Sequence, residues 1–376
     1  MTEYRAVPTM AEIEATPSCG LRLVSTFSGC GGSCLGFRMA GYRTLYACEF
    51  IPAAAEVYRL NHPGVPVDTR DIRAVQVADI LKVTGLRVGE LDVLEGSPPC
   101  ASFSTAGKRE AGWGKVKKYS ETEQRIDDLF FEFIRLLEGL QPRVFVAENV
   151  KGLVMGKAKG YFKMIYRAME QAGYRVACRV LDAQYFGVPQ HRERAIFIGV
   201  RNDLERAPSH PKPQTAPVPL RAALPWIVAS ASNSSHRPTT RPATRPATTI
   251  LAGGPSDESG ECIADTSIAR YAIGDEWDKL AVGEQSEKYF QLMKCDPEKP
   301  VGTITQAGGA GNIASVTHPF EKRKFTIGEL RRICGFPDDF QLTGTYAQQW
   351  ERLGRAVPPP MMRAVAEHIR DAILEV

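Results

Sequence analysis

The sequence predicts an α/β protein with a mostly parallel sheet and a smaller, irregular and β-rich second part. Apolar runs of strand length alternate with helical patterns over the first two-fifths of the chain, which is typical of a parallel sheet covered on both faces. A proline-rich, low-complexity stretch then interrupts this alternation. The chain has 376 residues, of which 43% are hydrophobic and 24% are charged, so it is long enough for two globular domains.

The individual elements follow from the apolar periodicity of each segment. Strands of the parallel sheet are predicted at residues 21–27, 43–48, 91–95 and 144–147. Helices are predicted at residues 33–40, 52–61, 126–139, 326–334 and 361–374. An antiparallel pair of strands is predicted at residues 174–181 and 195–200.

Shifts in composition predict the domain boundaries. Prolines cluster at residues 208–225, and residues 236–249 repeat the phrase Arg-Pro-Ala-Thr, a pattern that breaks helices and favours an extended chain. We therefore predict an N-terminal arm, a large domain made of two separated segments, and an insert between them. The arm covers residues 1–20, the large domain 21–204 and 319–376, and the insert 205–318.

Several classes of protein are excluded by the composition. The apolar runs are far shorter than the roughly 20 residues that cross a bilayer, and residues 1–19 lack the apolar core of a signal peptide. We therefore predict a cytoplasmic protein without a membrane segment. The nine cysteines include no CxxC pair, so neither a metal site nor a disulfide framework is predicted.

A glycine-rich turn predicts a ligand-binding loop after the first strand. In Phe27-Ser-Gly-Cys-Gly-Gly32 the glycines let the backbone approach a ligand near a helix N-terminus, although many such turns are only structural. Glu49 ends the second strand and can accept both ribose hydroxyls of an adenosine cofactor. Asp71 can bind the adenine amino group, or it can cap a helix.

The phrase Gly96-Ser-Pro-Pro-Cys100 predicts a nucleophile. Its prolines restrict the backbone and hold Cys100 at the carboxyl end of a strand, where open α/β sheets bind their ligands. Glu148 ends the next strand and would lie over the same edge, where a protonated carboxyl can donate to a ring nitrogen of the substrate. Arg192 and Arg194 share one face of a strand and can bind a carbonyl oxygen and phosphate, or orient Glu148.

Taken in order, these phrases resemble the motifs of the DNA (cytosine-5) methyltransferase family. The matching motifs lie at residues 27–32, 98–100, 148–150, 190–194, 326–337 and 354–359. The resemblance covers about residues 21–204 and 319–376, and the insert at residues 205–318 corresponds to that family's target recognition domain. It implies a Rossmann-like domain dependent on S-adenosylmethionine, with a smaller target recognition domain. The implied reaction transfers a methyl group to C5 of a flipped-out cytosine in DNA.

The resemblance also implies roles for individual residues. Cys100 attacks C6 of the cytosine, Glu148 binds N3 and the exocyclic amine, and Arg194 binds the O2 carbonyl, with Arg192 in the same strand. The implied cofactor-binding residues are Phe27, Gly29, Gly31, Gly32, Glu49, Phe50, Asp71, Ile72, Pro98, Arg355, Ala356 and Val357. The implied DNA-binding residues are Lys108, Arg109, Lys115, Lys117, Lys118 and Gln190. The expected partner is double-stranded DNA, bound by a monomer.

The basic stretch at residues 108–118 has two interpretations. A run of this kind is often a solvated loop, and it can also contact phosphates. By the resemblance, residues 102–118 form the mobile loop that closes over the flipped base.

Two positions depart from the family pattern. Ala101 follows the nucleophile where glutamine is common, which affects the loop and not the chemistry. Arg355 replaces an asparagine near the sulfonium of the cofactor, where its charge would be repelled. Either Arg355 pairs with Glu351, or it binds a carboxylate on the transferred carbon. In the second case the cofactor is carboxy-S-adenosylmethionine and the product is 5-carboxymethylcytosine.

Three other functions remain as alternatives. A tRNA cytosine-5 methyltransferase would share the motifs, but usually has a smaller insert. A catalytically silent DNA-binding homologue should have lost Cys100 or Glu148, and both are present. A thiol hydrolase would need a histidine motif near the cysteine. The target sequence is left open, as is a role in restriction-modification, in a phage or in regulation.

Overall fold

A computed structural model describes residues 6–99, 117–119, 122–124, 129–155, 158–214, 216–227 and 266–375. For residues 117–119 and 122–124 it describes the backbone alone.

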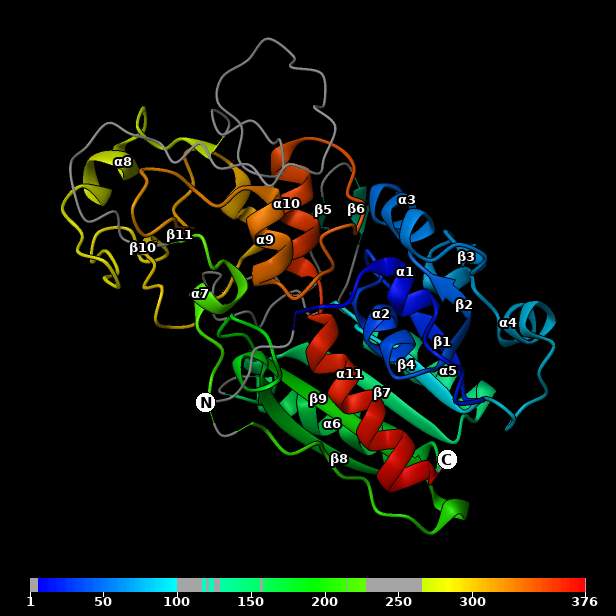
Figure 1. Ribbon diagram of the computed structural model, residues 1–376. Helices are drawn as coiled ribbons and strands as arrows, with labels where there is room; N and C mark the ends of the chain where they lie inside the picture. The colour runs from blue at the N-terminus through cyan, green and yellow to red at the C-terminus, as the bar shows by residue number, and fades with distance from the viewer. Residues whose placement is uncertain are drawn as a thin grey trace.

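The protein is built on a seven-stranded sheet (Figure 1). Its strands are β1 (Arg22–Thr26), β2 (Arg43–Cys48), β3 (Val67–Asp68), β4 (Val93–Gly96), β7 (Val144–Val150), β8 (Tyr174–Asp182) and β9 (Glu193–Arg201). They lie in the order β3-β2-β1-β4-β7-β9-β8. The first five in this order are parallel, and β9 is antiparallel to both β7 and β8. The connections reverse direction between β1 and β4, which is where open α/β sheets bind ligands.

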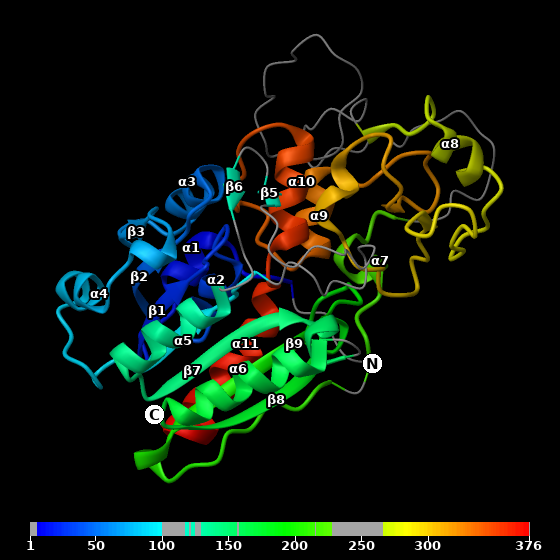
Figure 2. The same ribbon diagram turned by 180° about the vertical axis from the view of Figure 1, so that it is seen from behind.

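Helices cover both faces of this sheet, as the two opposite views show (Figures 1 and 2). One face packs against α2 (Gly32–Met39), α3 (Pro52–Asn61) and α11 (Pro359–His368). The other packs against α4 (Val77–Thr84), α5 (Leu129–Leu140) and α6 (Lys159–Gln171). Neighbouring residues of β1 enter opposite cores, Leu23 on the first face and Val24 on the second. Burial on both faces explains why the strands are continuous apolar runs.

Short elements connect these layers. They are α1 (Met10–Glu14), η1 (Ile72–Ala74), η2 (Lys151–Val154), η4 (Ala183–Tyr185), η5 (Asn202–Leu204) and a π-helical segment after α11 (Ile369–Leu374). A separate antiparallel pair is formed by β5 (Lys117–Tyr119) and β6 (Thr122–Gln124).

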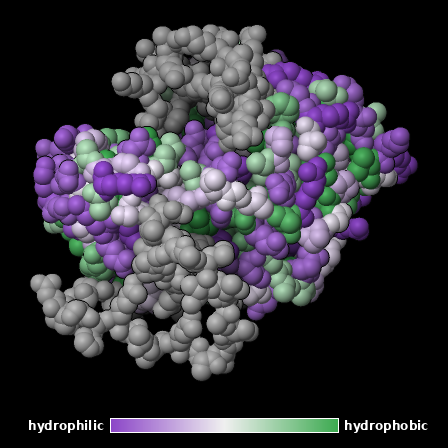
Figure 3. All heavy atoms as spheres, turned by 90° about the horizontal axis from the view of Figure 1, so that it is seen from above, coloured by the Kyte–Doolittle hydropathy of each residue, from purple (hydrophilic) through white to green (hydrophobic). Residues whose placement is uncertain are grey.

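The second part of the molecule is mostly irregular. It contains α7 (Leu220–Ala223), α8 (Ala272–Trp277), β10 (Met293–Lys294), η7 (Gln306–Gly309) and β11 (Val316–Thr317), and the chain then continues into α9 (Ile327–Ile333) and α10 (Tyr346–Arg355). Within the described residues 205–214, 216–227 and 266–318, β10 and β11 are the only strands. The expected irregularity is present there, but the β-rich character is not. Polar residues cover much of the described surface seen from above, with apolar residues in small groups between them (Figure 3).

The two parts meet where residues 301–304 run along residues 189–192. The His191 amide donates to the Val301 carbonyl at 2.8 Å, and the Val301 amide donates to the Pro189 carbonyl at 2.9 Å. Gln190 and Val301 form an isolated parallel bridge. An extended segment of the predicted insert is thereby joined by backbone hydrogen bonds to the segment that leads into β9.

Candidate active site

The predicted site residues come from the carboxyl ends of neighbouring parallel strands. Phe27 follows β1, Glu49 follows β2, Pro98 lies just beyond β4, and Glu148 lies near the end of β7. Because these strands are neighbours in one sheet, motifs that are far apart in the sequence reach the same edge. The sequence predicts that both the cofactor and the nucleophile lie at this edge of the sheet.

The loop at residues 27–32, here called the cofactor loop, needs a special backbone. Phe27 has a φ of 54° and Gly31 a φ of 91°, both in the left-handed region. A side chain on Gly32 would place its Cβ 2.4 Å from the Val357 carbonyl oxygen. Gly32 and Val357 therefore lie against each other, and the first and last motifs of the sequence meet at this loop.

Glu49 is tied to the cofactor loop by its carboxylate. One oxygen accepts the Gly29 amide at 2.7 Å, and the other accepts the Ile51 amide at 2.7 Å. Burial raises the pKa of Glu49, and these two amides oppose that effect. Each oxygen keeps a lone pair for a further donor, so the group is suited to accept the two hydroxyls of a ribose.

The next predicted cofactor residues have structural partners of their own. Asp71 caps η1, because its carboxylate accepts the Arg73 amide at 3.0 Å and also forms an ion pair with the Arg73 side chain. Ile72 is 2% exposed and packs in the core that α5 covers. Phe50 follows Glu49 and is half-buried. The capping interpretation of Asp71 is thus confirmed, and the adenine contacts stay predictions.

Cys100 and several predicted DNA contacts lie outside the described residues. These are Cys100, Lys108, Arg109 and Lys115. Lys117 and Lys118 belong to β5, for which the backbone alone is described.

The approach to Cys100 is held by a residue that the sequence analysis did not single out. The Asn149 side-chain amide, 3% exposed, donates to the Pro98 carbonyl at 2.9 Å. Asn149 also accepts the Val150 amide at 2.9 Å through its carbonyl oxygen. The hydrogen bond from Asn149 to Pro98 joins the end of β7 to the proline segment, two residues before Cys100. The sequence signal that could have identified Asn149 is its place in the motif Glu-Asn-Val at residues 148–150.

Glu148 and Arg194 form a pair beside this segment. The Arg194 Nε lies 2.8 Å from the Glu148 Oε1, and both side chains are largely buried. Arg194 also donates to the Glu193 carbonyl at 2.8 Å. Burial lowers the pKa of Arg194, and the charge of Glu148 opposes the shift. The arginine therefore restricts the orientation of the Glu148 carboxyl group.

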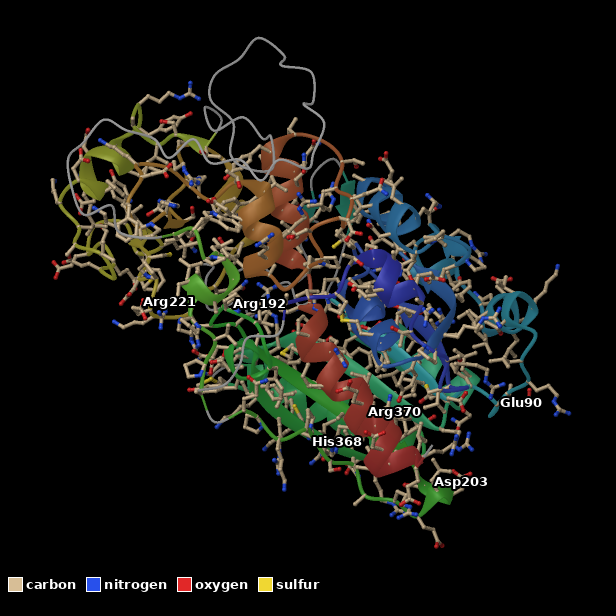
Figure 4. All side chains as sticks on the ribbon, in the orientation of Figure 1. Glu90, Arg192, Asp203, Arg221, His368 and Arg370 are labelled. Atoms are coloured by element: carbon tan, nitrogen blue, oxygen red, sulfur yellow. The ribbon has the colours of Figure 1, made fainter. Side chains whose placement is uncertain are left out.

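Arg192 lies at the junction between the two parts of the molecule (Figure 4). It is 2% exposed, and its terminal nitrogens donate to the Ile304 carbonyl at 3.1 Å and the Gly354 carbonyl at 2.9 Å. Burial is the main reason that the pKa of Arg192 falls to about 9, with Arg194 as a second cause. These contacts give Arg192 a place between the insert and the segment that carries Arg355.

Gln190, a predicted DNA contact, has no exposed side-chain surface. Its carbonyl oxygen accepts the Ile304 amide at 3.3 Å, and its nitrogen donates to the Cys334 sulfur at 3.4 Å. In this arrangement the Gln190 amide connects Ile304, in the predicted insert, with Cys334.

Arg355 pairs with Glu351 one helical turn earlier. The Arg355 Nη2 lies 2.7 Å from the Glu351 Oε1, and the Nε donates to the same oxygen at 2.9 Å. The pairing alternative raised by the sequence is therefore observed. Arg352, which the sequence analysis did not consider, is 4% exposed and lies 3.5 Å from the other Glu351 oxygen. The charges of both arginines lower the pKa of Glu49, so they lie near the residue predicted to bind the ribose.

Comparisons with known proteins agree with this geometry. The C-5 cytosine-specific DNA methylase family matches residues 21–371. The chain belongs to that family. It is 30% identical to the type II methyltransferase M.DdeI of Desulfomicrobium norvegicum, over 93% of this chain and 88% of the relative. It is also 30% identical to the type II methyltransferase M.NgoFVII of Neisseria gonorrhoeae, over 93% of this chain and 86% of the relative.

Solved structures show the same fold. A prophage-encoded DNA modification methyltransferase of E. coli is 21% identical, with a TM-score of 0.69, over 95% of this chain and 100% of that chain. The Dnmt2 methyltransferase of S. pombe is 16% identical, with a TM-score of 0.60, over 93% of this chain and 98% of that chain. The fold is thus that of S-adenosylmethionine-dependent, Rossmann-like methyltransferases.

The protein is therefore a DNA (cytosine-5) methyltransferase that uses S-adenosylmethionine and acts on DNA. Among the described residues, no helix is both long and apolar enough to cross a membrane. Nor does that part of the chain hold three or more His, Cys, Asp or Glu side chains placed to bind a metal ion.

Proposed function

We propose that this methylase acts through a covalent bond between Cys100 and C6 of a cytosine flipped out of double-stranded DNA. The Cys100 thiolate adds to C6, which makes C5 nucleophilic enough to take the methyl group. Loss of the C5 proton then restores the aromatic ring and expels the thiolate. A thiol suits both steps, because it is a good nucleophile and can leave again.

Glu148 and Arg194 position the base in this mechanism. Glu148 holds N3 and the exocyclic amine of the cytosine, and Arg194 holds the O2 carbonyl while it restrains the Glu148 carboxyl. The observation that carries the proposal is the 2.8 Å pair between Arg194 and Glu148, next to the segment that Asn149 fixes ahead of Cys100. The pair is placed before any substrate arrives, so little reorganisation is needed on binding.

The residues of the cofactor side fit an adenosine-containing methyl donor. S-adenosylmethionine supplies an electrophilic methyl group on a sulfonium. Glu49 offers two acceptor oxygens for the ribose, and the cofactor loop lies against Val357 without an intervening side chain. Phe50 is suited to stack on the adenine, with Asp71 and Ile72 at its edge.

The remaining parts of the proposal concern DNA binding, the oligomeric state and the location of the enzyme in the cell. Residues 205–318 form the target recognition domain, and the basic residues at 108–118 contact phosphates around the flipped base. The enzyme works as a monomer in the cytoplasm and is encoded by a bacterium or a phage. Gln190 supports this interface indirectly, because it holds Ile304 of the recognition domain.

A trapping experiment tests the covalent step. DNA that contains 5-fluorocytosine at the target should form a stable adduct with the wild type and S-adenosylmethionine, because fluorine cannot leave C5 as a proton does. Cys100→Ser should form no adduct and show no turnover, yet bind the cofactor normally. Cys178→Ser is the matched control, since that cysteine lies in β8 and should trap like the wild type. An adduct in Cys100→Ser, or none in the wild type under turnover conditions, contradicts the mechanism.

We also propose a second activity, transfer of a carboxymethyl group from carboxy-S-adenosylmethionine. The observation in its favour is the position of Arg355 on the cofactor side, where it shares the Glu351 carboxylate with Arg352. A carboxylate on the transferred carbon can take the place of Glu351 against Arg355 through a charge-assisted contact. The nucleophile and the base-binding pair serve both reactions, because only the migrating group differs.

Competition between the two cofactors tests this second activity. DNA treated with both is digested, and the modified cytosines are weighed by mass spectrometry. Arg355→Asn should abolish the carboxymethyl product and raise methylation, whereas Glu351→Gln should raise the carboxymethyl share by releasing Arg355 from its pair. Methylation alone in the wild type, with carboxy-S-adenosylmethionine at saturation, contradicts it.

A further inference from the structure

A buried acid lies beneath the cofactor loop and has no part in the reaction described above. Glu95, on β4, is 1% exposed. Its carboxyl group faces the side of the sheet that α2 and α3 cover, where its charge contributes to the raised pKa values of Cys34 and Tyr58. A carboxyl group at such a depth is costly unless it is hydrogen-bonded or neutral.

A chain of hydrogen bonds connects this acid to the cofactor loop. The Glu95 carboxyl lies 2.7 Å from the Ser25 hydroxyl, and the Ser25 hydroxyl lies 2.9 Å from that of Ser28. Ser28 in turn lies 3.3 Å from the Cys48 carbonyl. Cys48 precedes Glu49, and Ser28 precedes the glycine that donates to Glu49. The chain therefore runs from β4 under the loop to the residues assigned to the ribose.

Counting hydrogens along this chain shows what it requires. Its three contacts need three hydrogens, and the Cys48 carbonyl can only accept. Ser25 and Ser28 supply one hydrogen each. The third must come from Glu95, so all three contacts are hydrogen bonds only when this carboxyl carries a proton. The Ser33 hydroxyl also faces the carboxyl, but its hydrogen cannot reach between the two other serines.

We propose that Glu95 is a positioning residue whose proton holds the cofactor loop in its binding conformation. In the protonated state the donors run in one direction, from Glu95 to Ser25, then to Ser28, then to the Cys48 carbonyl. Once Glu95 ionises, Ser25 donates to the carboxylate. The single hydrogen of the Ser28 hydroxyl can then be donated either to the Ser25 hydroxyl or to the Cys48 carbonyl, so one of these two contacts has no hydrogen.

The surroundings put this change in the physiological range. Burial raises the pKa of Glu95 to about 7, and the charge of Glu148 adds to the effect, against the hydrogen bond from Ser25. Among the described residues, the titratable groups that interact electrostatically with Glu95 are Cys34 from α2, Tyr58 from α3 and Glu148 from β7. Burial also raises the pKa values of Cys34 and Tyr58, so both stay neutral across this range. Glu95 is protonated below its pKa and loses its proton as the pH rises through about 7.

The inference rests on the assignment of the cofactor loop, and it predicts a pH-dependent affinity. The dissociation constant for S-adenosylmethionine, measured by calorimetry without DNA, should rise about fivefold between pH 6 and pH 8.5 because of Glu95. This is the factor that corresponds to about 1 kcal/mol for one hydrogen bond. The cofactor itself titrates, so the result is the difference between the wild type and a variant.

Glu95→Gln supplies that comparison. Its amide donates to Ser25 at every pH, so the variant should keep the tight binding of the low-pH wild type and lack the fivefold rise. Identical pH profiles in the two proteins would overturn the proposal. If the wild type binds no S-adenosylmethionine at any pH, it is the cofactor assignment that fails.

Ser28→Ala provides a second test, which also covers a Glu95→Gln protein that does not fold. Without the Ser28 hydroxyl, the remaining contact between Ser25 and Glu95 is satisfied in either protonation state. Affinity should therefore be lower than in the wild type and should lack the part of the pH dependence due to Glu95. A variant with the full wild-type profile would also overturn the proposal.

Discussion

Gly32 shows how the absence of a side chain lets two segments far apart in the sequence come into contact. Its Cα faces the Val357 carbonyl, and an added Cβ would lie 2.4 Å from that oxygen and 3.0 Å from the Phe336 ring. The backbone of the last motif cannot yield without moving the start of α11. Gly32 is therefore needed because it has no side chain, which lets the Val357 backbone approach. The sequence motif marks this glycine as important but does not show the contact that requires it.

The Gly32→Ala variant should lose cofactor affinity. Its methyl group must push Val357 away from the cofactor loop, and overpacking of this kind costs about 1–3 kcal/mol. If this cost falls on the binding conformation, the dissociation constant for S-adenosylmethionine should rise by about 5- to 150-fold in calorimetry.

Gly160→Ala is the matched control for this substitution. Gly160 lies in α6, where a Cβ would meet nothing within 4 Å. Alanine also favours a helix by up to about 1 kcal/mol over glycine, so stability and affinity should be unchanged or improved. Equal affinity in Gly32→Ala and Gly160→Ala would show that the contact with Val357 is not needed for binding.

At the scale of elements, α9 begins at a buried charge cluster. Thr326 and Glu329 form a capping box, and Glu329 also accepts both terminal nitrogens of Arg323, at 2.8 and 2.9 Å. Arg323 and Glu329 are 6% and 4% exposed. One carboxylate therefore both starts the helix and fixes the chain that enters it.

Glu329→Gln should destabilise the protein by about 2–3 kcal/mol. It leaves the buried Arg323 with Glu321 as its remaining acidic partner in the described structure, and removing one partner of a buried pair is costly. Chemical denaturation measures the loss. Asp278→Asn, which removes the exposed partner of Lys322, should cost less than about 1 kcal/mol. Equal losses in the two variants would contradict the role given to Glu329.

The sequence predicted elements well where their periodicity is local. The predicted helix at 52–61 coincides with α3, and the antiparallel pair at 174–181 and 195–200 corresponds to β8 and β9. Helices α4, α6 and α10 were not anticipated. The apolar side chains that α10 buries are Trp350 and Leu353, and most of its other residues are polar, so its apolar stripe is narrow. Within its described residues the insert contains only the short strands β10 and β11, and residues 301–304 run along a loop and not along a neighbouring strand.

At the scale of the whole molecule, the junction between the two parts could not be predicted. Arg192 and Gln190 belong to a motif that suggested catalysis and DNA contact. Apart from the Cys334 sulfur that Gln190 contacts, their partners are backbone atoms of Ile304, more than a hundred residues later, and of Gly354. Backbone partners leave no signature in side-chain identity, so only the fold reveals them.

The same junction also involves the glycine-rich turn of η7. The Trp350 indole donates to the Thr305 carbonyl at 2.8 Å, and Lys324 donates to the carbonyls of Gly308 and Ala310. Burial lowers the pKa of Lys324 to about 8. Residues 301–310 are thus held by groups of the large domain, although composition assigned them to the insert.

Exchange of the insert should therefore succeed or fail according to where it is cut. A chimera that takes residues 205–300 from a relative with another target, and keeps residues 301–318, preserves the carbonyls that Arg192, Trp350 and Lys324 bind. We expect it to bind S-adenosylmethionine within about twofold of the wild type and to modify a different DNA sequence, read by bisulfite sequencing of plasmid DNA. Exchange of residues 205–318 replaces those carbonyls with a backbone of different register, so buried donors lose their partners and cofactor affinity should fall severalfold. Two outcomes would contradict this prediction: a 205–300 chimera that still modifies the original sequence, which places recognition elsewhere, or equal cofactor affinity in both chimeras, which removes the junction from cofactor binding.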